Sequence, residues 1–169
     1  MLAGCNVSSS VHLEDRPFQL HSLENSSLYL HQRLRVEAGR ARVFIQGGVA
    51  RKGYDINEYA TQCNFEIDSV AHQGVDIEVG SYHIERVQAL YEEVVLLGPV
   101  QIAALRLTMF DGYNDTAAFE GYHFWLNSGR QTQVRRMTCH GVLAEGIDRR
   151  PPTLAEIRQT LGALVTLGN

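Results

Sequence analysis

Seven histidines are the side chains whose type most directly suggests chemistry, because imidazole both ligates metals and transfers protons near neutral pH. They are His12, His21, His31, His72, His83, His123 and His140. None stands in a His-x-His or His-x-x-x-His pair, the spacings that place two rings on one face of an element. His31 and His83 fall on outward positions of amphipathic strands. We therefore expect solvent exposure, no metal site and no other cofactor, although separate strands can still bring two rings together.

Nucleophilic catalysis lacks a sequence signature in this chain. There is no Gly-x-Ser-x-Gly motif, and the serines gather in the N-terminal stretch or in turns, where hydroxyls cap backbone groups. Cys139 and His140 are neighbours, but adjacent residues of a strand point to opposite faces. They are therefore not expected to form a thiolate–imidazole pair. These observations favour a protein that is not an enzyme.

An aromatic cluster late in the chain is the feature most suggestive of binding; its members are Tyr113, Phe119, Tyr122, Phe124 and Trp125. In a strand, Tyr122 and Phe124 share one face. His123 and Trp125 share the opposite face, and if that face is outward they can stack on a glycan or on a partner's aromatic side chain. The alternative is that the core and a C-terminal helix cover both faces.

Strands that would position these residues are indicated by apolar and polar residues alternating with a period of two. The alternation runs through 28–36 and resumes through 41–46 after a turn at 37–40, which predicts a hairpin. A loop with one helical turn is expected over 51–57. Further strands are expected over 62–69, 75–79, 82–87, 100–110, 119–126 and 132–142.

The segment 62–69 shows how these strands are expected to lie on a core. Its inward residues are Cys63, Phe65 and Ile67, and its outward residues are Asn64, Glu66 and Asp68. Short strands separated by turns, without intervening helices, predict a mainly β chain, either an antiparallel sandwich or a small barrel.

One helix is expected near the C-terminus, after Pro151 and Pro152. Thr153-Leu154-Ala155-Glu156 is a capping box, in which the threonine hydroxyl and the glutamate carboxylate each accept from a backbone amide of the first turn. The apolar residues that follow helical spacing are Leu154, Ile157, Leu161 and Leu164. This amphipathic helix is expected to pack on the sheet, the alternative being that it faces a partner or a membrane.

Size and charge limit the classes of function. The chain has 169 residues, 44% of them hydrophobic, which is enough for one domain with its own core. Its 15 basic and 19 acidic residues give a net charge of −4 and no footprint for nucleic acid. The longest uncharged apolar run, 94–104, is far shorter than the roughly 20 residues of a membrane span.

The start of the chain, Leu2-Ala3-Gly4-Cys5, resembles the lipobox of bacterial lipoproteins. The resemblance implies that Cys5 carries acyl chains and anchors the protein to a bacterial envelope membrane. Asn6 stands where an aspartate commonly marks inner-membrane retention, so the resemblance favours the outer membrane, facing the periplasm. Residues 1–27 are then a lipobox remnant and a mostly flexible polar tether, and 28–169 form a single globular β-rich domain.

With Cys5 assigned to lipid by that resemblance, Cys63 and Cys139 remain as an even pair. In an oxidising periplasm such a pair is a disulfide candidate. The alternatives are two buried thiols packed as small hydrophobic groups, or a metal site, which the absence of a Cys-x-x-Cys pair disfavours.

The chain is also similar to a set of small proteobacterial envelope lipoproteins, in 41–48 (ARVFIQGG), 63–66 (CNFE) and 153–159 (TLAEIRQ). No activity follows from this similarity. The leading hypothesis is a non-enzymatic envelope lipoprotein whose domain binds a partner protein or supports an assembly. The alternatives are a β-barrel or sandwich that binds a lipid, glycan or small molecule, and a hydrolase whose residues come from distant strands.

Overall fold

A computed structural model describes residues 23–94 and 117–168. The predictions for Cys5, for the tether before Leu23, for Tyr113 and for the strand at 100–110 lie outside these residues. Leu23, the first of the described residues, has a buried side chain.

The described residues form ten strands, two 3-10 turns and one helix. In chain order they are β1 (Ser27–Leu30), β2 (Leu34–Val36), β3 (Arg42–Gln46), β4 (Val49–Arg51), η3 (Gly53–Asp55), β5 (Gln62–Ile67), β6 (Val75–Ile77), β7 (Gly80–Glu93), β8 (Ala118–Asn127), β9 (Val134–His140), η4 (Gly146–Asp148), α1 (Leu154–Leu161) and β10 (Val165–Leu167).

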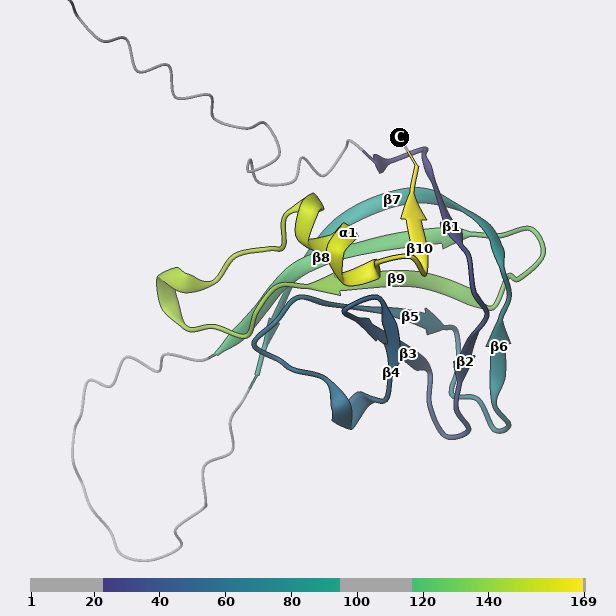
Figure 1. Cartoon of the computed structure of the whole chain (residues 1–169), viewed down its shortest axis with the longest axis horizontal. Coiled ribbons are helices and arrows are strands. Elements are labelled where there is room, and N and C mark those ends of the chain that lie inside the picture. The colour runs from purple at the N-terminus through teal and green to yellow at the C-terminus, as the bar shows by residue number, and fades with distance from the viewer. Residues whose placement is uncertain (1–22, 95–116, 169) are drawn as a thin grey trace, which may run out of the picture.

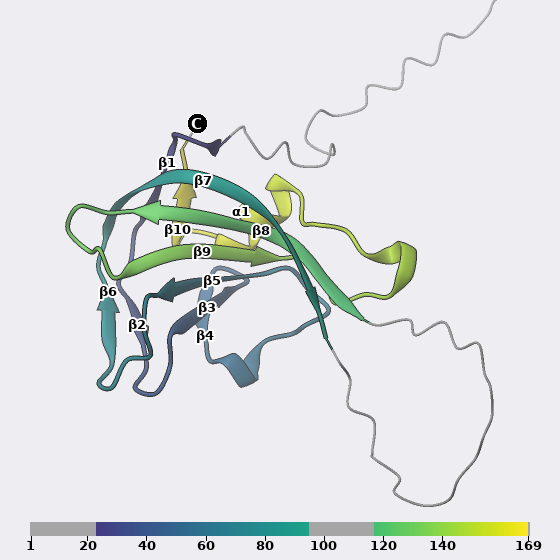
Figure 2. The same ribbon diagram turned by 180° about the vertical axis from the view of Figure 1, so that it is seen from behind.

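Eight of these strands form one sheet in the order β10-β1-β7-β8-β9-β5-β3-β4, and β2 pairs with β6 in a second, small sheet. Every pairing is antiparallel. The large sheet curls into a half-barrel, and α1 lies against it, directly before the edge strand β10 (Figures 1 and 2). The expected mainly β, antiparallel, barrel-like fold with one C-terminal helix is confirmed.

The expected hairpin between 28–36 and 41–46 is wrong. The alternation within 28–36 does place Leu28, Leu30, Leu34 and Val36 in the core. However, the chain leaves the large sheet after β1, and β2 pairs with β6 instead of β3. A period of two indicates the face that a side chain takes, but it does not identify the neighbouring strand.

A tight hairpin occurs instead at Gly47-Gly48, between β3 and β4. Gln46 and Val49 are paired across it, and both glycines have positive φ angles, 64° and 75°. This is the backbone conformation that a two-residue type I′ turn requires. The helical turn expected in the following loop is η3.

The core lies between the inner face of the half-barrel, the small sheet and α1. Its largest fully buried side chains include Phe65, Tyr82, Phe124, Met137, Ile157 and Leu161. The helix begins as expected: Thr153 Oγ1 accepts from the backbone N–H of Glu156, and the Glu156 carboxylate accepts from the Thr153 N–H. Leu164 is buried but follows the helix, in the short connection to β10.

Strand β5 is buried on both faces, so the outward exposure expected for Asn64 and Glu66 is wrong. Asn64 is 1% exposed and Glu66 is 8% exposed. Because β5 lies inside the sheet between β3 and β9, its polar side chains have larger cross-strand neighbours: Asn64 is opposite Phe44, and Glu66 is opposite Arg136.

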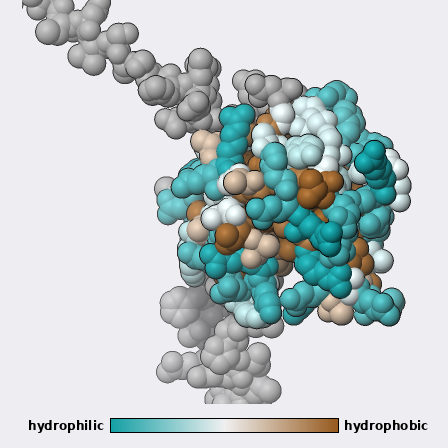
Figure 3. Space-filling model, turned by 45° about the vertical axis from the view of Figure 1, so that its right-hand side comes forward, coloured by the Kyte–Doolittle hydropathy of each residue, from teal (hydrophilic) through white to brown (hydrophobic). Residues whose placement is uncertain are grey.

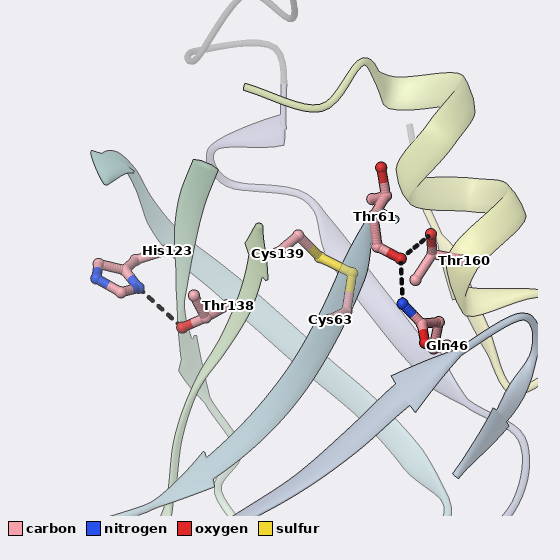
Figure 4. The surroundings of a disulfide bond; sticks show 7 residues. All are labelled: Gln46, Thr61, Cys63, His123, Thr138, Cys139 and Thr160. Carbon is pink, nitrogen blue, oxygen red and sulfur yellow. Dashed lines mark hydrogen bonds between the residues drawn. A yellow bond between two sulfur atoms is a disulfide. The ribbon is translucent and has the colours of Figure 1, made fainter. Parts of the chain in front are cut away.

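Cys63 and Cys139 form a disulfide, as predicted. The two residues are directly opposite each other on β5 and β9, with their Cα atoms 4.0 Å apart. Figure 4 shows the bridge crossing between the two strands, near the point where Thr160 of α1 donates to the backbone oxygen of Thr61.

Candidate functional site

A groove of about 620 Å³ lies between the β2–β3 connection and the β3–β4 hairpin. Strand β2 lies beside β3 in both ribbon views (Figures 1 and 2), which brings these two segments together. The groove is lined by Arg33, Leu34, Arg35, Glu37, Gly39, Arg40, Ala41, Arg42, Val43, Phe44, Ala50, Arg51, Lys52, Gly53 and Tyr54. Its volume lies within the range of roughly 300–1,000 Å³ that is usual for ligand sites.

Positive charge dominates this lining. Six of its side chains are cationic, and Glu37 is the one carboxylate among the residues that line it in the described part of the chain. The whole chain, by contrast, carries a net charge of −4. A concave surface lined by one sign of charge raises the local concentration of oppositely charged ligands. The groove is therefore suited to anions.

Five of the six groove cations are already in ion pairs with neighbouring carboxylates: Arg33, Arg35, Arg42, Arg51 and Lys52. Arg35 Nη1 lies 2.8 Å from Asp76 Oδ1, and Arg33 Nε lies 3.3 Å from Glu78 Oε2. All four side chains are partly or largely exposed. Exposed pairs of this kind stabilise a protein by only about 0–1 kcal/mol, so a ligand carboxylate can compete with Glu78 for Arg33 and with Asp76 for Arg35. Among residues 23–94 and 117–168, no carboxylate lies within ion-pair distance of Arg40.

Two aromatic side chains, Phe44 and Tyr54, also line the groove and form its aromatic wall. Lys52 Nζ lies 3.7 Å from the Glu37 carboxylate, and Glu37 together with Tyr54 raises the pKa of Lys52 above its ordinary value. Tyr54 itself is 81% exposed. The half-buried Phe44 ring packs so closely on Gly53 that a Cβ there would lie 3.3 Å from it.

Sequence reasoning misses this groove, because its cations are spread over 33–52 in several elements. One signal was present: two consecutive glycines at 47–48 between alternating residues mark a two-residue hairpin. That hairpin places Arg51 opposite Phe44, on the same face of the sheet.

Buried Glu66 connects the groove to the outer face of the sheet, the face opposite the core. Its carboxylate accepts from Arg42 Nε at 3.1 Å and from Arg136 Nη2 at 2.9 Å. Two guanidinium groups thus compensate one buried carboxylate, and losing Glu66 would leave both cations without this partner. This cluster holds Arg42 at the lip of the groove.

The candidate residues from sequence, His123 and Trp125, both lie on this outer face and are partly exposed. His123 Nδ1 is 2.8 Å from Thr138 Oγ1, and Figure 4 shows this nitrogen facing Thr138. Desolvation, followed by the charge of Arg136, lowers the pKa of His123 to about 4. His123 is therefore neutral at pH 7.

Trp125 is surrounded by cations. Its Nε1 donates to Gln88 at 3.1 Å, and the guanidinium carbons of Arg86, Arg135 and Arg136 lie 5.0, 5.2 and 5.2 Å from its ring centroid. These are cation–π distances. A glycan can stack on this ring only by displacing a guanidinium group.

The residues that could act as nucleophiles near these histidines are not accessible. The Thr138 hydroxyl that contacts His123 belongs to a side chain only 3% exposed. Cys139 is in the disulfide, and His140 lies on the opposite face of the strand, edge-on to Phe119 at 5.3 Å between ring centroids. The expectation that Cys139 and His140 do not pair is confirmed.

Within the described ranges, no three His, Cys, Asp or Glu side chains come together as metal ligands. In the same ranges, no helix has the length and apolar character needed to cross a membrane. On the face drawn in Figure 3, hydrophilic side chains predominate, with hydrophobic ones in small groups among them.

Comparison with protein-family models, with curated proteins and with solved structures finds no match to this chain.

Proposed function

We propose that this chain is a non-enzymatic envelope lipoprotein whose domain binds an acidic segment of a partner protein in the groove between β2, β3 and β4. The observation that carries the proposal is the concentration of six cationic side chains around Phe44 and Tyr54 in a chain of net negative charge. Carboxylates of a partner would meet these cations, and its apolar side chains would lie on the aromatic wall.

The exposed edge of β4 favours a peptide over a small molecule. This strand is the last of the large sheet, and all three of its residues are exposed. Backbone groups on the outer edge of such a strand can pair with an added extended segment. A peptide lying there would place alternate side chains toward Arg51 and Lys52, whereas a small ligand would use the cations alone.

Two features support a location at the outer membrane, facing the periplasm. The first is that Leu2-Ala3-Gly4-Cys5 resembles a lipobox. The second is the Cys63–Cys139 disulfide, because disulfides persist in oxidising compartments such as the periplasm. We infer that the domain is held by lipidated Cys5 at the outer membrane and faces the periplasm.

The groove is tested with a labelled peptide of eight aspartates and the double variant Arg40→Glu/Lys52→Glu, followed by fluorescence anisotropy. Arg158→Glu is the matched control, because Arg158 is an exposed cation on α1, outside the groove. We expect the double variant to bind at least ~10-fold more weakly and the control to bind like the unmodified protein. Binding should also weaken as salt is raised, since exposed charges are screened.

Equal affinity of the double variant and the control would overturn the groove as the binding site. Citrate is the second arm: if it displaces the peptide at equal carboxylate concentration, the ligand is a small anion and the peptide proposal is overturned. Anchoring is tested separately by replacing Cys5 with Ala in the full-length gene and fractionating the cells. Unchanged membrane association would disprove lipidation at Cys5.

A further inference from the structure

Two β-bulges flank Trp125, one on each neighbouring strand. On β7 the register shifts between Ile84 and Arg86, so Glu85 is an extra residue. On β9 the register shifts between Val134 and Arg136, so Arg135 is an extra residue. Each bulge breaks the alternation of faces at that point.

The consequence is that arginines gather around a single indole ring. Without the β9 bulge, Arg135 and Arg136 would point to opposite faces; with it, both guanidinium carbons lie 5.2 Å from the Trp125 centroid. The β7 bulge leaves Arg86 directly opposite Trp125, with its guanidinium carbon at 5.0 Å. Bulges commonly serve to re-aim side chains beside binding sites.

Two of the three guanidinium groups have no acidic partner within the described part of the chain. Arg136 is committed to Glu66, whereas no carboxylate lies within ion-pair distance of Arg86 or Arg135. The nearby Glu85 carboxylate accepts from Asn127 Nδ2 at 2.6 Å. Arg86 and Arg135 are both exposed. Two guanidinium groups without a carboxylate partner in the described part of the chain thus lie 5.0 and 5.2 Å from one ring centroid.

We propose that Arg86 and Arg135, held on Trp125, form a second anion site that binds a phosphate group. A guanidinium donates two parallel hydrogen bonds to phosphate oxygens, and two such groups match the charge of a phosphate monoester, about −2. The role of Trp125 is to hold the two arginines by cation–π contact, so that little side-chain freedom is lost when the phosphate binds. This site does not depend on the function proposed for the groove.

Trp125 also provides the assay, because it is the one tryptophan of the chain. Its fluorescence is followed while inorganic phosphate is added to the full chain, with sodium chloride of equal ionic strength as a parallel titration. We expect a saturable change with phosphate that sodium chloride does not reproduce. In Arg86→Gln/Arg135→Gln the apparent affinity should fall at least ~10-fold, since two charge-assisted interactions are removed.

Two controls keep the result specific. Arg158→Gln removes an exposed arginine of α1, which is not one of the residues around Trp125. Arg40→Glu/Lys52→Glu removes positive charge from the groove. Both variants should retain the phosphate response. Line broadening of the phosphorus NMR signal, measured in Arg40→Glu/Lys52→Glu so that the groove contributes little, gives a second readout that does not use tryptophan. An unchanged response in Arg86→Gln/Arg135→Gln, or an equal response to sodium chloride, would overturn the site.

The source of the phosphate is distinguished by vesicles of phosphatidylcholine with and without phosphatidic acid. A lipid phosphate should give Trp125-dependent binding only to vesicles that contain phosphatidic acid, and Arg86→Gln/Arg135→Gln should abolish it. If only inorganic phosphate acts, the ligand is soluble. If neither acts, the proposal is refuted.

Discussion

Acidification between pH 7.5 and 4.5 should destabilise this domain through His140. Its side chain is 7% exposed, and burial, together with the charges of Arg42 and Arg136, lowers its pKa from 6.5 to about 4. In the unfolded chain the ring is free to take up a proton near pH 6.5, whereas in the folded chain it stays neutral until about pH 4. The unfolded state therefore binds more protons in this window, and stability falls as the pH falls.

The magnitude follows from these two pKa values. At pH 7.5 neither state is appreciably protonated at His140, so the difference in proton binding is close to zero. At pH 4.5 the unfolded ring is fully charged and the folded ring is mostly neutral, which lowers the free energy of unfolding by about 2.5 kcal/mol. Partly exposed His123 changes stability in the same direction. The Glu156 carboxyl, whose pKa is lowered to about 2 chiefly by Arg150, loses its contribution only below about pH 4.5.

Urea unfolding followed by circular dichroism at pH 7.5, 6.0, 5.0 and 4.5 measures this loss. His140→Gln is the matched variant, because it keeps a polar side chain at the site but cannot titrate. The difference in unfolding free energy between pH 7.5 and 4.5 should be smaller in the variant by about 2.5 kcal/mol. His31→Gln is the control, since it replaces an exposed histidine by the same residue type.

The chemical shifts of the His140 ring protons, followed by NMR as a function of pH, show whether this residue causes the loss of stability. A ring that titrates near pH 6.5 in the folded protein would refute the reasoning. So would a pH dependence that persists undiminished in His140→Gln.

Three further substitutions test the packing. Replacing both Cys63 and Cys139 by Ala should lower the free energy of unfolding by about 4.5 kcal/mol, since the bridge spans a separation of 76 residues; an unaltered urea midpoint would contradict this. Thr153→Ala should cost about 1 kcal/mol through loss of the helix cap, with Thr153→Ser restoring it in the same assay. Gly121→Ala should lower the melting temperature strongly, because its Cβ would collide with the backbone oxygen of Cys139; a mild effect would show that the strands can separate there.

Short sequence patterns predicted the fold well where a few neighbouring residues are enough to define an element or its buried face. Thr153 and Glu156 mark the helix start, and the alternation through Cys63, Phe65 and Ile67 identifies inward residues that the structure confirms. The same alternation fails for Asn64, because exposure of the second face depends on neighbouring strands that are distant in sequence.

The pairing partners of the strands and the positions of the two candidate sites could not be predicted from period-two alternation. The pairing of β2 with β6 and the groove both arise from long-range packing. The bulges beside Trp125 did leave a trace: buried Ile84 is followed by buried Val87, and buried Val134 by buried Met137, so the inward spacing is three instead of two. A spacing of three within a strand indicates an inserted residue. It does not indicate that two insertions flank the same ring.

The disulfide has a consequence for the integrity of the chain. The polypeptide before residue 95 supplies β5, and the polypeptide after residue 116 supplies β8 and β9, which lie between β7 and β5 in the sheet. The Cys63–Cys139 bond therefore joins the two portions a second time, outside the peptide backbone. If a protease cut the backbone anywhere between β7 and β8, the two pieces would remain one covalent molecule with interleaved strands, and they would separate on a denaturing gel only after reduction.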